Sequence, residues 1–108
     1  MRMTQKNWDR IETHNKKTTI RVHELKEGIQ NVYCGSRYKP KLLGQLKVSK
    51  PSSIKMFKEL IKKDAKSDGF NTLTELTLEL MELNKNIMPD TILFIHPIKK
   101  VSKNMEVR

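Results

Sequence analysis

The chain has 108 residues, of which 36% are hydrophobic and 31% charged, and its formal net charge at pH 7 is +10. This length and composition indicate one globular domain with a modest core and exclude a disordered chain. The excess of basic residues fits a polyanionic partner such as RNA, and it fits a lysine-rich solubilising surface equally well.

The sequence gives little support for a membrane-spanning segment, a metal site or a disulfide. The start "MRMTQKNW" has no apolar signal region, and the longest apolar run, "TILFI", is too short to span a membrane. Cys34 is alone, which fits a reducing compartment, so we expect a cytoplasmic protein. The histidines, at positions 14, 23 and 96, lack ligand spacing, and there is no glycine-rich phosphate loop. We therefore expect neither a metal nor a cofactor.

The first third of the chain predicts one helix and two strands. Residues 4–12 suit a short helix in which Trp8 and Ile11 form the apolar pair. Strands are expected at residues 18–23 and 29–34, with a turn between them.

The polar strand at 18–23 raises a question about its two faces. Side chains alternate along a strand, so Lys17, Thr19 and Arg21 share one face while Ile20 shares the other with Thr18. If Ile20 enters a core, then Thr19 and Arg21 line either solvent or a polar site.

The loop "GSRYKPK" leads into the alternating run "KLLGQLKVSK", which predicts a strand. Leu42, Leu46 and Val48 are expected on its buried face. Gly44 inside the strand predicts a bulge or a close approach of another chain segment.

The second half predicts a short strand at 53–57, a helix ending near Gly69, and a second helix that begins at Thr72. A buried strand is expected at 91–98, so the domain should span residues 1–98, followed by a polar tail at 99–108. The second helix carries a leucine stripe expected to be core: Leu73, Leu76, Leu80 and Leu83. Because strands dominate without βαβ alternation, we expect an α+β fold with a small barrel.

Three stretches, "KKTTIR", "DAKSDGFNTLTEL" and "DTILFIHPI", together resemble the ASCH domain over residues 8–98. The resemblance implies a PUA-like β-barrel of about five or six strands with two to three short helices, and a role in RNA binding or metabolism. In a bacterial subgroup that hydrolyses acetylcytidine, the functional positions correspond here to Lys16, Thr19 and Asp68. Thr19 would be the nucleophile and Lys16 its base, while Asp68 would orient the lysine or protonate the leaving amine. Simple alternation leaves open whether Lys16 or Lys17 faces Thr19.

Two functions therefore stand as hypotheses. The first is a module that binds RNA or a nucleotide through a polar pocket and a basic flank, and the alternative is an amidohydrolase acting on an acylated pyrimidine nucleoside. A weaker third is an interaction subunit for an acidic protein. We expect no membrane partner, and a monomer is favoured although the oligomeric state stays open.

Tyr38 is read either as a base-stacking ring or as a lid over the barrel. The expected ligand- or RNA-binding residues are Lys17, Arg21, Arg37, Tyr38, Lys39 and Lys41.

Overall fold

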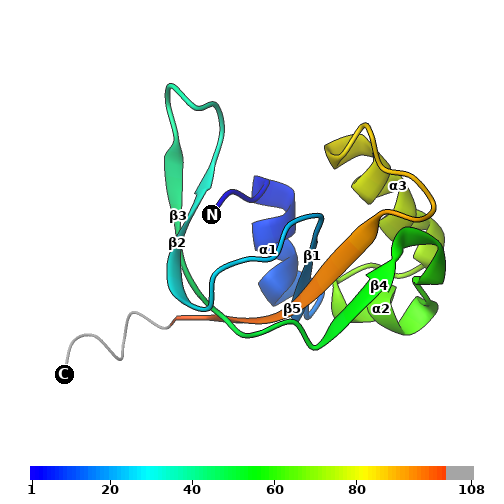
Figure 1. Cartoon of the computed structure of the whole chain (residues 1–108). Helices are drawn as coiled ribbons and strands as arrows, with labels where there is room; N and C mark the ends of the chain where they lie inside the picture. Colours follow the sequence, from blue (N-terminus) through cyan, green and yellow to red (C-terminus); the bar gives the residue numbers. More distant parts are fainter. Residues whose placement is uncertain (102–108) are drawn as a thin grey trace.

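A computed structural model describes residues 1–101, which form a five-stranded antiparallel sheet with three α-helices (Figure 1). The α+β class is confirmed. The elements are, in chain order, α1 (Gln5–Thr13), β1 (Thr18–Arg21), β2 (Gly28–Cys34), β3 (Lys41–Val48), β4 (Ser53–Met56), the 3₁₀ turn η1 (Phe57–Glu59), α2 (Lys62–Ser67), α3 (Leu73–Leu83) and β5 (Ile92–Lys100).

Strand β5 holds the sheet together because it is long and pairs with three others. Its first half pairs with both β1 and β4, and its last residues pair with β3, which continues to β2. Figure 1 shows the β2–β3 hairpin and α1 at one end of the molecule and β4, α2 and α3 at the other. Within residues 1–101 no ladder joins β1 to β2, so the sheet is open and the closed barrel that we expected is not seen.

Two apolar clusters stabilise these two ends. Burying such side chains removes apolar surface from water and is the main favourable term in folding. The cluster under α2 and α3 contains Ile20, Leu60, Ala65, Phe70, Leu76, Leu80, Leu93 and Ile95. The cluster under α1 contains Met3, Trp8, Val32, Leu46, Val48 and Ile98.

Gly44 confirms the predicted close approach and bulge. A Cβ built on this glycine would lie 2.8 Å from a ring carbon of Trp8, and the register of β2 against β3 shifts beside it. The extra residue reverses the alternation of side chains on one side of the bulge. As a result Leu42, expected in the core, is 57% exposed, and Leu43 packs against the core in its place.

The leucine stripe of α3 is buried only in part. Thr72 caps the helix as predicted, its hydroxyl oxygen accepting a hydrogen bond from the Glu75 N–H at 3.1 Å. The helix ends at Leu83, and the Asn84 side chain donates to a carbonyl of the last turn. Leu83 is therefore at the helix end, where it is 50% exposed rather than part of the core.

The last strand extends two residues beyond the expected 91–98. Strand β5 continues through Lys100, where backbone pairing with β3 holds the chain. The Lys100 ammonium lies 2.7 Å from a carboxylate oxygen of Glu12 and 4.5 Å from the ring centre of Trp8. Contacts with α1 therefore accommodate a charged residue at this strand end. The rest of the expected tail, 102–108, lies outside the described residues.

None of the helices in residues 1–101 is both long enough and apolar enough to cross a membrane.

Candidate functional site

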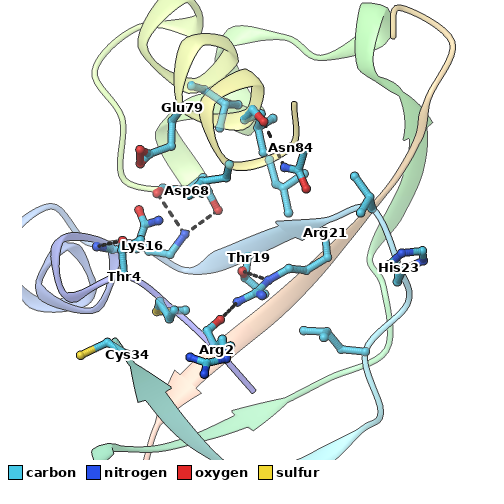
Figure 2. Close-up of a pocket in the computed structure, with 18 of the residues that line it drawn as sticks. Arg2, Thr4, Lys16, Thr19, Arg21, His23, Cys34, Asp68, Glu79 and Asn84 are labelled. Carbon is cyan, nitrogen blue, oxygen red and sulfur yellow. Dashed lines mark hydrogen bonds and ion pairs between the residues drawn. The ribbon is translucent and has the colours of Figure 1, made fainter. Parts of the chain in front are cut away.

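A pocket of about 460 Å³ lies between β1, the first residues of the chain, the end of β2 and helix α3 (Figure 2). Four residues singled out from the sequence line it: Lys16, Thr19, Arg21 and Asp68. On its other wall α3 contributes apolar side chains, those of Leu76, Leu80 and Leu83.

The backbone before β1 decides which lysine enters the pocket. Asn15 has φ +53, in the left-handed region, and the Lys16 N–H donates to the carbonyl of Arg10 at 3.0 Å. Strand pairing begins only at Thr18, so strict alternation does not extend back to the lysines. The Lys16 side chain is buried in the pocket wall, whereas Lys17 is exposed and does not line the pocket. Lys17 therefore lies outside this pocket, and its expected contact with a ligand stays a prediction.

Lys16 and Asp68 form a buried ion pair. The distance from Nζ to Oδ1 is 2.7 Å, and the side chains are 2% and 7% exposed. Thr18, which sequence reasoning did not assign to the site, donates from Oγ1 to the same carboxylate oxygen at 3.3 Å. Asp68 caps the end of α2, and Gly69 follows with φ +88. A Cβ on Gly69 would lie 3.0 Å from Cβ of Lys16, so glycine allows the close approach.

Burial shifts both members of this pair towards their neutral forms. Desolvation lowers the pKa of Lys16 below its ordinary value, and nearby Arg21 and Arg10 lower it further, while the attraction of Asp68 opposes the shift. Desolvation raises the pKa of Asp68, against the attraction of Lys16. Both shifts reduce the free-energy cost of moving a proton from the ammonium to the carboxylate. Such a transfer would give a neutral amine, which can act as a base, and a carboxylic acid, which can donate a proton.

Thr19 and Arg21 are neighbours on the pocket face of β1. The Thr19 Oγ1 accepts from Arg21 Nε at 3.0 Å, so its own proton is left for another acceptor in the pocket. Arg21 also donates from one terminal nitrogen to the carbonyl of Arg2 at 2.8 Å. Burial lowers the pKa of the guanidinium, and Asp68 partly offsets this effect. Ile20, between them, is buried in the core under α2 and α3.

His96, which pairs with Thr19 across the sheet, is fully buried and has a structural role. Its Nε2 accepts from the Leu25 N–H at 3.0 Å, and its Nδ1 lies 2.8 Å from the carbonyl of Ser49. Because Nε2 is the acceptor, Nδ1 carries the proton and donates to that carbonyl. Both ring nitrogens are therefore used to hold loops, as expected for a histidine in the core.

Several pocket residues could not be found from sequence patterns. Arg10 bridges two of them, with its Nη1 2.8 Å from the Asn7 amide oxygen and 3.2 Å from Glu79 Oε2. For Glu79, the one sequence feature that could have indicated a place in the pocket was its carboxylate beside the buried leucines of α3. Cys34 is half-buried at the pocket wall. Further lining residues of this kind are Arg2, Thr4, His23 and Asn84.

The basic loop between β2 and β3 forms a separate surface. Arg37, Tyr38, Lys39 and Lys41 are all exposed, and none lines the pocket. Tyr38 is 91% exposed, so the reading of this ring as a lid is wrong. Figure 1 shows the loop at the tip of the hairpin, away from α2, which carries Lys62, Lys63 and Lys66. The basic side chains of the loop and of α2 therefore lie at two different ends of the molecule.

Within residues 1–101 no three His, Cys, Asp or Glu side chains are close enough together to ligate one metal ion. Comparisons with protein-family models, with curated proteins and with solved structures found no match for this chain.

Proposed function

We propose that the chain is an ASCH-like domain that binds a nucleoside or nucleotide unit, free or within RNA, in the pocket lined by Lys16, Thr19, Arg21 and Asp68. The observation that carries this proposal is the convergence of four polar side chains, two of them buried charges, on one cavity. Buried charges are costly in a protein interior and cluster at functional sites.

The size and walls of the pocket suit this class of ligand. Small-molecule sites usually enclose about 300–1,000 Å³ and combine apolar walls with a few placed polar groups. The leucines of α3 offer a surface for the flat face of a base, and Glu79 and Asn84 offer polar groups to its edge. The exposed ring of Tyr38 and its basic neighbours would add contacts to the chain of an RNA.

The neighbouring lysines provide a matched test of the proposal. Calorimetric titration of the four common ribonucleosides into the wild type should give saturable binding of at least one. Lys16→Met should weaken that binding by about tenfold or more, because it removes a charge from the pocket wall. Lys17→Met should leave it unchanged, because that side chain is exposed outside the pocket. Absence of binding by every nucleoside and nucleotide would contradict the proposal.

A second candidate function is hydrolysis of an acylated pyrimidine nucleoside such as acetylcytidine. The lowered pKa of Lys16, in the pocket that also contains the Thr19 hydroxyl, favours it. In this reaction neutral Lys16 takes the proton of Thr19 as its oxygen attacks the acyl carbon. The carbon–nitrogen bond breaks, the amine leaves with a proton from Asp68, and water hydrolyses the resulting ester to acetate and free Thr19.

A further inference from the structure

The two arginines at one end of the pocket form no salt bridge with a carboxylate of residues 1–101. In the part of the chain that the structure describes, Arg21 bonds to the Thr19 hydroxyl and to the carbonyl of Arg2, and the Arg2 side chain bonds to the carbonyl of Gly35 at 2.7 Å. Figure 2 shows Arg2 and Arg21 close together beside Thr19. A guanidinium has more N–H donors than these bonds use, so both keep donors for a ligand.

The acids of the pocket do not neutralise these arginines. Asp68 bonds to Lys16 and Glu79 bonds to Arg10, and these are the two acids among the residues that line the cavity. Asp68 attracts Arg21 without a direct ion pair within residues 1–101. The end of the pocket at Arg2 and Arg21 therefore has an excess of positive charge. At this end Arg21 is half-buried.

Helix α1 adds to the same positive end. Its N-cap residue, Thr4, and its third residue, Asn7, line the pocket beside Arg2. The N-terminus of a helix carries a partial positive charge, which an acidic residue in the first turn usually offsets. Helix α1 has no acidic residue in its first turn.

We propose that Arg2 and Arg21 bind a phosphate group, so that the ligand is a nucleotide whose phosphate lies at this end of the pocket while its base lies against α3. The inference rests on the proposed function and adds the class of ligand. Arginine suits a phosphate because its planar fork can donate two parallel hydrogen bonds to the oxygens.

The test compares nucleosides with their 5′-monophosphates. Both sets are titrated calorimetrically at low ionic strength in a phosphate-free buffer, together with inorganic phosphate alone. Any purification tag belongs at the C-terminus, since Arg2 and Thr4 line the pocket. The monophosphates should bind about tenfold or more tightly than the nucleosides, as expected for charge-assisted hydrogen bonds. Arg2→Gln should remove most of this difference. Arg37→Gln, which removes an exposed arginine outside the pocket, should keep both affinities.

The outcomes separate the two proposals. If nucleosides bind and their monophosphates bind no better, the phosphate site is wrong and the nucleoside pocket stands. If inorganic phosphate competes with the monophosphates and this competition is lost in Arg2→Gln, the site is supported. If nothing binds, both proposals are wrong. Dinucleoside monophosphates identify the source of the phosphate. If they bind more tightly than the 5′-monophosphates, the site takes the phosphate of an RNA linkage. If they bind more weakly, it takes the phosphate of a free nucleotide.

Discussion

Lys16 and Asp68, 52 residues apart in the chain, join the start of β1 to the end of α2 through a bond of 2.7 Å. Both side chains are almost completely buried. Replacement of such a pair by apolar residues of similar size is often neutral or stabilising, so the pair is weak evidence for a stabilising role. Its place in the wall of a pocket is what links it to function.

Removal of the lysine alone should be strongly destabilising. Lys16→Met leaves the Asp68 carboxylate buried with only the Thr18 hydroxyl as a side-chain donor, and we expect a loss of about 3–5 kcal/mol near pH 7. Urea denaturation measures this loss. The exposed Lys17→Met is the control and should change stability by less than about 0.5 kcal/mol. Equal losses in the two variants would show that burial of Lys16 is energetically unimportant.

The same variant should become more stable as the pH falls. Burial raises the pKa of Asp68 above its ordinary value of 3.8, and Lys16→Met removes the attraction that opposes the shift. A carboxyl whose pKa is raised on folding contributes stability that is full below the unfolded value and is lost as the pH rises through the folded value. Lys16→Met should therefore differ less from the wild type near pH 4 than near pH 7. A deficit that is independent of pH would mean that Asp68 does not titrate in the folded variant.

The double variant Lys16→Met/Asp68→Leu should separate function from stability. With both charges replaced by apolar side chains, most of the stability lost in Lys16→Met should return. Binding of nucleosides should not return, because the pocket has lost two polar groups. The measurements are urea denaturation and calorimetric titration on the same preparation. A double variant as unstable as the single one would indicate that the pair is needed mainly for folding.

Alternation and capping signals predicted the sheet core and the start of α3, but not the local irregularities. Leu46 and Val48 are buried as expected, whereas the bulge beside Gly44 exposes Leu42. One extra residue in a strand exchanges the side chains that face the core with those that face solvent. The glycine in the pattern indicated a bulge but did not show which residue would be the extra one. Leu83 belongs to the apolar stripe by spacing, yet it lies at the helix end, where half of its surface is exposed.

Strand periodicity predicted the candidate site only where its residues share a strand, and the assignment of Lys16 and Asp68 rests on the resemblance to the ASCH domain. Thr19 and Arg21 follow from alternation along β1. The choice of Lys16 over Lys17 depends on the left-handed turn at Asn15 and on where strand pairing begins, which no periodicity shows. Glu79 and Arg2 enter the pocket from distant segments through tertiary packing alone.

Gly69 should be required for the geometry of the site. In Gly69→Ala the new Cβ would lie 3.0 Å from Cβ of Lys16 at a positive φ, so we expect a loss of about 1–3 kcal/mol and weaker nucleoside binding. Gly28→Ala is the control, because it has the same kind of backbone strain with nothing within 4 Å. Denaturation and titration of both variants check the expectation, and equal effects of the two substitutions on binding would contradict it.

If the chain is an amidohydrolase, it should convert acetylcytidine to cytidine and acetate, which chromatography of the products measures. Thr19→Ala should abolish turnover and Thr19→Ser should retain part of it, since serine keeps the hydroxyl. Lys16→Met should reduce the rate by about 10²–10⁴-fold through loss of the base. The active form pairs a neutral Lys16 with a protonated Asp68, so the rate should fall at lower pH, where Lys16 gains a proton, and at higher pH, where Asp68 loses its proton. Turnover that survives Thr19→Ala would rule out the nucleophile.

The basic loop should bind single-stranded RNA without affecting the pocket. Each phosphate contacted by a lysine or arginine contributes a slope of about −0.7 to the plot of log affinity against log salt. The triple variant Arg37→Gln/Lys39→Gln/Lys41→Gln should therefore make the slope less steep by about 2 while nucleoside affinity stays unchanged. Fluorescence titrations of a labelled RNA at several salt concentrations measure the slope. Binding that is indifferent to salt, or absent at low salt, would contradict a role for the loop.

A nucleoside titration followed by two-dimensional NMR of the labelled protein tests the central claim most directly. The four ribonucleosides and their 5′-monophosphates are added to millimolar concentration, and the backbone amide shifts are followed residue by residue. Our account predicts saturable shifts at Lys16, Thr19, Arg21 and Asp68 for at least one of these compounds, and no such shifts in the Lys16→Met/Asp68→Leu variant. Shifts confined to the β2–β3 loop, or no saturable shifts with any compound, would contradict it.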